Sequence, residues 1–209
     1  MRVYADNAAT TYLSDVALNT LLDCLKNYNG NPNSLHTDGQ IAKEKLDESR
    51  EKVAKALNAA KPNEIYFTSG GSEADNQALI SAARGLVKKG KKHLISLNIE
   101  HHAILHTLRK LEKEGFEVTL LKPQPNGIVD VKDVEDAIRE DTALVSIMFA
   151  NNEMGAVQPI AEIGKLCHEK GVLFHTDAVQ AAAHLPIDVQ AMNIDMLSLS
   201  AHKFHGPKG

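Results

Sequence analysis

The stretch Thr142-Ala143-Leu144-Val145-Ser146-Ile147-Met148-Phe149-Ala150 is the longest strongly apolar run in this chain of 209 residues. A membrane-spanning helix needs about 20 apolar residues, so the run is too short to cross a bilayer. Strands that are apolar throughout, rather than at alternate positions, are typical of parallel sheets with both faces covered. The run therefore predicts a buried strand over residues 143–150.

Other apolar segments alternate with amphipathic helical patterns on both sides of this strand. Segment 72–89, for example, repeats alanine, leucine and valine at the spacing of one helix face. Such alternation predicts an α/β fold, with a mostly parallel sheet and helices on both of its faces. The predicted strands cover residues 64–69, 93–97, 117–121, 143–150, 172–175 and 196–200. The predicted helices cover residues 39–57, 72–89, 102–114, 131–139 and 160–169.

The first sixty residues lack this alternation. Residues 6–11 are small and polar, and residues 29–34 read as an irregular loop before the long charged helix at 39–57. We expect residues 1–60 to form an N-terminal arm and helix that packs on the α/β domain or on a partner subunit. Residues 61–209 are expected to form the α/β domain itself.

Composition argues against several classes of protein. The 23 basic and 27 acidic residues give a net charge of −4 and are scattered along the chain. No basic block indicates nucleic-acid binding, and no basic amphipathic helix indicates a membrane surface. Residues 1–6 do not resemble a signal peptide, because Asp6 lies where the apolar region should begin. Cys24 and Cys167 are far apart, which favours free thiols in a reducing, cytoplasmic setting.

Five polar clusters each follow a predicted strand. In parallel α/β sheets, ligands bind beyond the carboxyl ends of the strands, and right-handed crossovers bring all of these loops to one edge. We therefore expect the five clusters to converge, although they are distant in sequence. They lie at residues 69–76, 100–102, 151–155, 175–180 and 200–203.

The first cluster contains Ser69-Gly70-Gly71-Ser72. Two glycines let the backbone approach a ligand closely, and Ser72 could cap a helix whose N-terminus favours an anion. Gly71 and Ser72 are therefore candidate phosphate-binding residues. The cluster is not a Walker loop, because no Gly-Lys-Ser/Thr follows it. A plain tight turn is the alternative interpretation.

Histidines dominate the second cluster, Glu100-His101-His102. The ring of His101 could stack on a flat cofactor and move protons, whereas a simple helix-start residue is the alternative. His102 and His106 have the i, i+4 spacing of metal ligands on a helix, but no third ligand is evident nearby. We therefore predict no metal site.

The third and fourth clusters carry hydrogen-bonding side chains. Asn152 either reaches into the site as an amide donor or belongs to a turn. Asp177 follows a buried strand, where a carboxylate needs a partner. A protonated ring nitrogen would be such a partner, and this pairing makes pyridoxal phosphate an electron sink. Gln180 could hydrogen-bond a substituent of the same ring, and a helix N-cap is the alternative role of Asp177.

The fifth cluster, Ser200-Ala201-His202-Lys203, presents a lysine just after the last predicted strand. A free lysine amine has a pKa of about 10.4 and is a poor nucleophile at neutral pH. Partial burial and a nearby cation lower that pKa and would let the amine form an imine with a cofactor aldehyde. Ser200 and His202 could hold an anion beside it. A solvent-exposed lysine is the alternative, which these polar and aromatic neighbours do not favour.

Taken in order, these motifs resemble those of the cysteine desulfurases of the NifS/IscS type. That family is a branch of the class V aminotransferase-like, fold-type I pyridoxal phosphate enzymes. The resemblance extends over essentially the whole chain and implies the large domain of that fold. Its motifs lie at residues 4–11 with 31–34, 67–76, 100–101, 151–158, 175–180 and 198–203.

The resemblance implies a role for each candidate residue. Lys203 would be the Schiff-base lysine, and His101 would stack on the pyridoxal phosphate ring as the second catalytic residue. Asp177 would pair with the pyridine nitrogen and Gln180 with the phenolic oxygen. The remaining cofactor contacts would come from Gly71, Ser72, Asn152, Ser200 and His202.

An activity and partners are implied as well. The family converts L-cysteine to L-alanine and passes the sulfur on, as a protein persulfide, to an acceptor or scaffold protein in iron–sulfur cluster assembly. It works as a homodimer with active sites near the subunit interface. Gly71-Ser72 stands where the family commonly has Ala-Thr, and Ala201 where Gly is common. Neither departure removes a hydrogen-bond donor.

A larger departure concerns the end of the chain. The family's sulfur-accepting cysteine and substrate-binding arginine lie beyond Gly209, and Cys24 and Cys167 match neither position. We therefore expect an incomplete large domain, no small C-terminal domain, and no full turnover by these 209 residues alone. Three alternatives stay open: another class V enzyme such as an aminotransferase or selenocysteine lyase, a non-catalytic fragment, and an unrelated nucleotide-binding α/β module.

Overall fold

The computed structural model describes residues 1–208, which fall into two compact units. Unit 1 comprises Met1–Phe67 and the segment that starts at Ala201, and unit 2 comprises Thr68–Ser200. Each unit is described by itself below. The expected division near residue 60 into an arm and a cofactor-binding domain stays a prediction.

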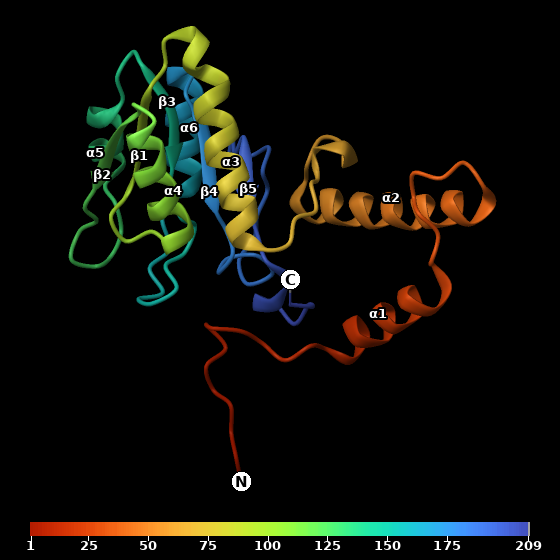
Figure 1. Cartoon of the computed structure of the whole chain (residues 1–209). Helices are drawn as coiled ribbons and strands as arrows, with labels where there is room; N and C mark the ends of the chain where they lie inside the picture. Colours follow the sequence, from red (N-terminus) through yellow and green to blue (C-terminus); the bar gives the residue numbers. More distant parts are fainter. Residues whose placement is uncertain (209) are drawn as a thin grey trace. The chain divides into compact units, whose positions relative to one another are not determined.

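Unit 2 is built on a five-stranded parallel sheet with the strand order β2-β1-β3-β4-β5 (Figure 1). This arrangement confirms the predicted α/β fold. In a parallel sheet all carboxyl ends lie at one edge, so the loops that follow the strands gather there. The strands are β1 (His93–Leu97), β2 (Glu117–Leu121), β3 (Thr142–Ser146), β4 (Leu173–Asp177) and β5 (Met196–Ser198).

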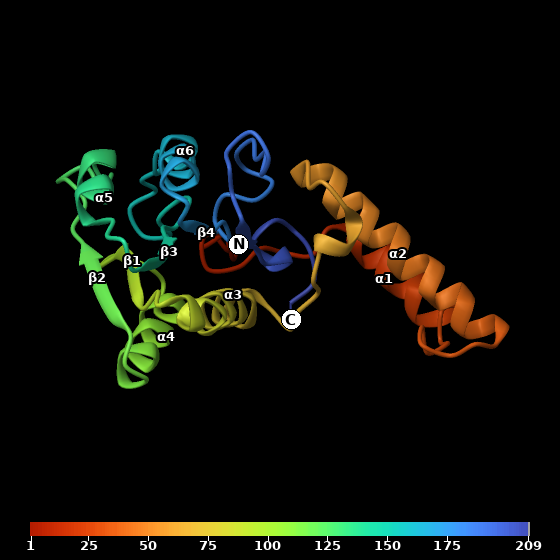
Figure 2. The same ribbon diagram turned by 90° about the horizontal axis from the view of Figure 1, so that it is seen from above.

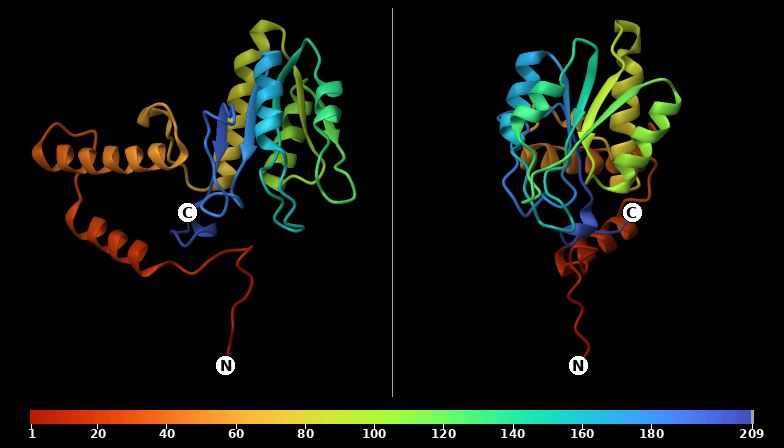
Figure 3. Two further views of the ribbon diagram at one scale, coloured as in Figure 1. Left: turned by 180° about the vertical axis from the view of Figure 1, so that it is seen from behind. Right: turned by 90° about the vertical axis from the view of Figure 1, so that its left-hand side faces the viewer.

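Helices cover both faces of this sheet (Figure 2). The helices α3 (Gly71–Leu86) and α4 (His102–Lys113) lie on one face, and α5 (Val131–Ala137) and α6 (Ile160–Lys170) lie on the other. Figure 3 shows the sheet of unit 2 with its flanking helices from two further sides. A short 3-10 turn, Val87–Lys89, extends α3.

Side chains of the central strands alternate between two hydrophobic cores. Ile95, Val145 and Phe174 are buried in the core on the α5 and α6 face. Leu94 and Leu144 are buried in the core on the α3 and α4 face. Because successive strand residues point to opposite faces, a strand buried on both sides must be apolar at nearly every position, as the sequence predicts.

Unit 1 contains two α-helices, α1 (Asp15–Asn27) and α2 (Thr37–Leu57), and the 3-10 turns Pro62–Glu64 and Ala201–Lys203. The predicted helix at 39–57 is α2, whereas α1 was not predicted. Ser14 is its N-cap and accepts a hydrogen bond from the backbone N–H of Ala17 at 3.2 Å. A serine followed by Asp15 is the sequence signal that could have identified this helix.

The predicted strand at residues 64–69 is wrong. Within residues 1–208, no strand pairs with this segment, which follows the 3-10 turn as irregular chain. Tyr66 and Phe67 remain 73% and 52% exposed, so their apolar character does not reflect a buried strand. The segment is held in unit 1 by Arg50, which donates to the Ile65 carbonyl at 3.0 Å and lies 5.4 Å from the Phe67 ring centre.

Other predicted boundaries shift by a few residues. The strand expected at 143–150 ends at Ser146, although its chain stays bonded to β4 through the N–H groups of Ile147 and Phe149. Strand β4 reaches Asp177, two residues past the predicted end. No helix among residues 1–208 combines the length and apolar character needed to cross a membrane.

A substitution at Gly164 would show how closely α6 packs against the chain at Met192. A Cβ atom at this buried position would lie 1.9 Å from the carbonyl oxygen of Met192. We expect Gly164→Ala to lower the free energy of unfolding by about 1–3 kcal/mol or more, because the backbone must move. Urea unfolding followed by circular dichroism measures this effect.

Gly85→Ala is the matched control, because nothing lies within 4 Å of its added Cβ. It should be neutral or stabilising by up to about 1 kcal/mol, as alanine is the better helix former. Equal stability of the two variants would contradict the proposed packing of α6.

Candidate functional site

The N-terminus of α3 lies beside the carboxyl ends of β4 and β5. A Cβ atom on Gly71 would be 2.9 Å from Val179 Cγ2 and 3.4 Å from the Ser200 Cβ. Because residues 64–69 form no strand, the first polar cluster reaches this edge through the packing of α3 and not by following a strand. Gly71, Ser72 and Ser200 are thereby brought near the strand end that carries Asp177.

Gly70 gives this helix start an unusual backbone. Its φ of 155° and ψ of 177° fall in a region that is essentially restricted to glycine. No side chain caps the helix at this point, and the first N–H groups of any helix have no partner within the helix. Together with the exposed Ser72 hydroxyl, they form a group of donors suited to an anion.

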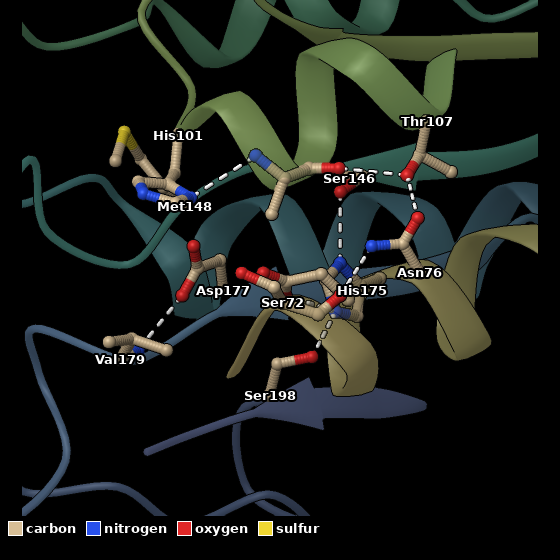
Figure 4. A network of polar contacts seen from close by, with 12 residues as sticks. Ser72, Asn76, His101, Thr107, Ser146, Met148, His175, Asp177, Val179 and Ser198 are labelled. Carbon is tan, nitrogen blue, oxygen red and sulfur yellow. Dashed lines mark hydrogen bonds and ion pairs between the residues drawn. The ribbon is translucent and has the colours of Figure 1, made fainter. Parts of the chain in front are cut away.

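Asp177 ends β4 and is only 6% exposed. Its Oδ1 accepts the backbone N–H of Val179 at 2.9 Å (Figure 4). Its own carbonyl accepts the N–H of Phe149 at 2.8 Å. The N-cap alternative does not hold, because a series of turns and no helix follows Asp177. Gln180 lies half-buried in the first of these turns.

Two further carboxyl groups are buried near Asp177, and sequence reasoning missed both. Asp75 is 1% exposed and Glu100 is 5% exposed. Burial raises the pKa of Asp75 to about 8 and that of Glu100 well above its ordinary value, and the negative charge of Asp177 adds to both shifts. Both lie within the polar clusters at residues 69–76 and 100–102, but no local pattern distinguishes these two carboxyl groups from the other acidic residues of the 27 in the chain.

A row of polar side chains crosses the α3 face of the sheet from β1 to β5. The Ser96 hydroxyl donates to the Ser146 carbonyl at 2.8 Å, and the Ser146 hydroxyl bonds His175 Nδ1 at 2.9 Å. His175 Nε2 in turn bonds the Ser198 hydroxyl at 3.0 Å (Figure 4). Burial lowers the pKa of His175 to about 3, so its ring is neutral at physiological pH. We call these four residues the polar row.

His101 is the N-cap of α4, and its Nδ1 accepts the N–H of Ala103 at 3.2 Å. The helix-start interpretation is therefore confirmed, and the exposed ring leaves cofactor stacking as a prediction. The His102 and His106 rings lie 5.4 Å apart, centre to centre. Among residues 1–208, no three histidine, cysteine or acidic side chains form a group suited to a metal ion.

The asparagine turn follows the extended end of β3. Asn151 builds it, since its Oδ1 accepts the N–H groups of Glu153 and Met154 at 2.9 and 2.8 Å. Its Nδ2 donates to the Ile99 carbonyl at 3.0 Å and joins this turn to the loop that carries Glu100. Asn152, the predicted amide donor, lies half-buried in the same turn, and its contact with a ligand stays a prediction.

Lys203 and His202 belong to unit 1, where N-terminal residues hold them. The Nζ of Lys203 donates to the Ala8 carbonyl. The carbonyl of His202 accepts both the N–H and the hydroxyl of Thr11, at 2.9 and 2.8 Å. His202 Nδ1 lies 3.1 Å from the Thr10 hydroxyl. The opening motif at residues 6–11 is thus a support for the lysine segment, and the approach of Lys203 to Asp177 stays a prediction.

Comparisons with known proteins assign the family. The profile of the aminotransferase class-V family matches residues 3–209. The chain is 56% identical, over its full length, to "Cysteine desulfurase IscS" of Clostridium botulinum (strain Kyoto / Type A2). It is 51% identical, over 99% of its length, to "Cysteine desulfurase IscS" of Methanosarcina thermophila. It covers 52% and 51% of these two relatives, about half their length.

Solved structures agree with this assignment. "SspA in complex with cysteine" superposes with a TM-score of 0.95 at 42% identity, and the match covers 100% of this chain and 59% of that one. "Crystal structure of DndA from streptomyces lividans" gives a TM-score of 0.86 at 38% identity, covering 99% of this chain and 57% of that one. The interpretation as an unrelated nucleotide-binding module is therefore wrong.

The buried neutral ring of His175 predicts a loss of stability in acid. Its pKa is about 3 in the folded chain and about 6.5 when unfolded, so between these values only the unfolded state takes up the proton. The contribution is fully present above pH 6.5 and is lost as pH falls toward 3. Its slope is about 1.4 kcal/mol per pH unit.

His175→Gln removes this titration, whereas His168→Gln changes an exposed histidine and is the control. Urea unfolding between pH 7.5 and 4.5 should show the wild-type chain losing stability relative to His175→Gln by about 1.4 kcal/mol per unit below pH 6.5. A difference that does not vary with pH would contradict a neutral buried ring.

Proposed function

Because this chain belongs to the class V aminotransferase family, we propose that it carries the cofactor-binding site of a cysteine desulfurase. The activity is the conversion of L-cysteine to L-alanine, with the sulfur passed on as a protein persulfide. The observation that carries the proposal is the buried Asp177 carboxylate beside the uncapped N-terminus of α3. Identities of 51–56% to relatives named cysteine desulfurase support the choice of substrate.

The residues present fit pyridoxal phosphate at both ends of the molecule. The glycine-restricted backbone at Gly70, the uncapped start of α3 and the Ser72 hydroxyl suit its phosphate. Asp177 suits its ring nitrogen. Within the described part of the chain, three buried oxygens lack a hydrogen-bond partner: Asp75 Oδ1, Glu100 Oε2 and Thr176 Oγ1. Such unsatisfied groups are typical of functional sites.

When bound, pyridoxal phosphate supplies an aldehyde that reacts with amines and a ring that accepts an electron pair. Asp177 would hold a proton on the ring nitrogen and so keep the ring electron-poor. Lys203 would remove the proton from the substrate Cα as a general base. His101 would cover the exposed face of the ring, and Gln180, Asn152, Ser200 and His202 would orient the cofactor and substrate.

We propose that neither cysteine of this chain is the sulfur acceptor. Burial raises the pKa of the Cys167 thiol to about 12, so it stays protonated and unreactive at neutral pH. Cys24 lies half-buried on α1. We propose that the persulfide forms on another cysteine and passes to an acceptor or scaffold protein in iron–sulfur cluster assembly. Two free thiols favour a reducing, cytoplasmic location.

A homodimer is proposed from the surface of α1. Within residues 1–208 this helix buries no residue, although it carries five aliphatic side chains that are 38–79% exposed: Val16, Leu18, Leu21, Leu22 and Leu25. Leu18, Leu21, Leu22 and Leu25 have the spacing of one helix face, and an exposed apolar face of this kind marks interaction sites in soluble proteins. A second copy of the chain is the proposed partner of α1.

Lys203 is tested by chemical trapping. The chain is incubated with pyridoxal phosphate, its absorbance spectrum is recorded, and borohydride reduction is followed by peptide mapping. The label should lie on Lys203, and Lys203→Ala should lower the amount of trapped cofactor at least tenfold. Lys208→Ala, five residues away in the same segment, should label normally. A label on another lysine would reject the assignment.

The reaction product distinguishes a desulfurase from an aminotransferase. L-cysteine added to the cofactor-loaded chain should change the visible spectrum and, when a sulfur acceptor is supplied, yield alanine. Formation of a keto acid would instead indicate an aminotransferase.

The dimer is tested on α1. The wild-type chain should sediment with twice the monomer mass of 22.7 kDa. Leu22→Glu with Leu25→Glu should weaken association at least tenfold, because burial of each leucine contributes about 1.5–3 kcal/mol. Leu120→Glu, at a 45% exposed leucine on β2, is the control and should leave the mass unchanged. A monomeric wild-type chain would reject this interface.

A further inference from the structure

Asp75 lies over the polar row, and the proposed reaction assigns it no task. It follows Gly71 by one helical turn on α3, and it is 1% exposed. Its Oδ1 lies 3.8 Å from His175 Nε2, without a hydrogen-bond partner in residues 1–208. The side chain of Ser198 hydrogen-bonds the carboxyl group. Asp75 therefore joins the phosphate-facing end of α3 to the strands β4 and β5.

Because His175 is neutral, every hydrogen bond in this network must have its donor at the same end. One of its ring nitrogens donates a hydrogen bond and the other accepts one. If Asp75 is protonated, its O–H donates to Ser198, the Ser198 hydroxyl donates to His175 Nε2, and His175 Nδ1–H donates to Ser146. If Asp75 is ionised, each of these bonds reverses, and His175 carries its proton on Nε2. The tautomer of His175 thus reports the protonation of Asp75.

We propose that Asp75 is a positioning residue for Asp177: as a neutral acid it bonds Ser198, sets the tautomer of His175 and holds the first turn of α3 against β4 and β5. The inference rests on the proposed function, in which Asp177 pairs with the cofactor ring. His175 and Asp177 are two residues apart on β4 and so share its α3 face. Fixing one side chain therefore restrains the strand that carries the other.

Electrostatics favour the neutral form of Asp75. The charged and titratable groups that face it are Asp177, Glu100 and His175. His175 is neutral and so does not offset the negative charge of these carboxyl groups, and like charges in one buried site do not all ionise. Burial raises the pKa of Asp75 to about 8, and the charge of Asp177 adds to the shift; both outweigh the hydrogen bond with Ser198, which lowers the pKa. A neutral Asp75 leaves Asp177 as the carboxylate that carries the charge.

Nitrogen NMR of the His175 ring, recorded on the chain without cofactor, tests this network directly. We expect the Nδ1–H tautomer at pH 6 and a change toward Nε2–H as pH rises through about 8. Asp75→Asn should keep the Nδ1–H tautomer at every pH, because its amide donates as the neutral acid does. Asp133→Asn, an exposed change on α5, should behave as the wild-type chain does.

Two NMR outcomes overturn the proposal. One is a wild-type tautomer that does not change between pH 6 and 9.5. The other is a pH-dependent change that survives in Asp75→Asn. Because the measurement uses no cofactor, it decides the inference even if the chain fails to bind pyridoxal phosphate, a failure that would count against the proposed function alone.

Cofactor affinity provides the second measurement. Titration with pyridoxal phosphate, followed by absorbance, should give Asp75→Asn an affinity within about threefold of the wild-type value. Asp75→Ala should bind at least tenfold more weakly, and amide hydrogen exchange in residues 71–74 should increase. Equal affinity of Asp75→Ala and the wild-type chain would reject a positioning role, as would a loss in Asp75→Asn as large as that in Asp75→Ala.

Discussion

Burial of polar side chains on the α3 face of β4 is the constraint on which the site of unit 2 depends. His175 is fully buried and Asp177 is 6% exposed, and neither position is tolerated without hydrogen-bond partners. Ser146 and Ser198 supply partners for His175, and the N–H of Val179 supplies one for Asp177. Helix α3 places the Asp75 carboxyl group beside His175. The carboxyl half of the sheet is therefore polar on one face, whereas the opposite face is apolar.

This division of the sheet determines where a ligand can bind. A parallel sheet covered on both faces leaves its carboxyl edge as the place where chemistry is accessible. The packing of α3 brings the uncapped N–H donors near Gly71 to the same edge as the buried carboxylate of Asp177. The N–H donors at the start of α3 would suit a phosphate, and the Asp177 carboxylate would suit a basic ring nitrogen. A single cofactor that carries these two groups at opposite ends matches this arrangement.

Unit 1 contributes a second kind of constraint. Residues 8–11, at the start of the chain, bind the carbonyl and ring of His202 and the amine of Lys203, nearly two hundred residues later. This long-range pairing explains why the polar, small opening of the sequence belongs with the lysine segment. The opening segment and the lysine segment both lie within the match to the aminotransferase class-V family, residues 3–209. The chain spans about half the length of its relatives named cysteine desulfurase.

The sequence by itself determined the alternation of strands and helices, because a strand buried on both faces must be apolar and an amphipathic helix must repeat with its own period. It also made Asp177 and Lys203 candidate site residues, since polar residues after apolar strands are conspicuous. The Gly70-Gly71-Ser72 turn was a candidate for the same reason, although the strand predicted before it does not form. Only the tertiary structure revealed Asp75, Glu100 and the polar row, and showed that residues 64–69 pair with no strand among residues 1–208. Burial and hydrogen bonding between residues 23 to 50 positions apart depend on packing, which no local pattern encodes.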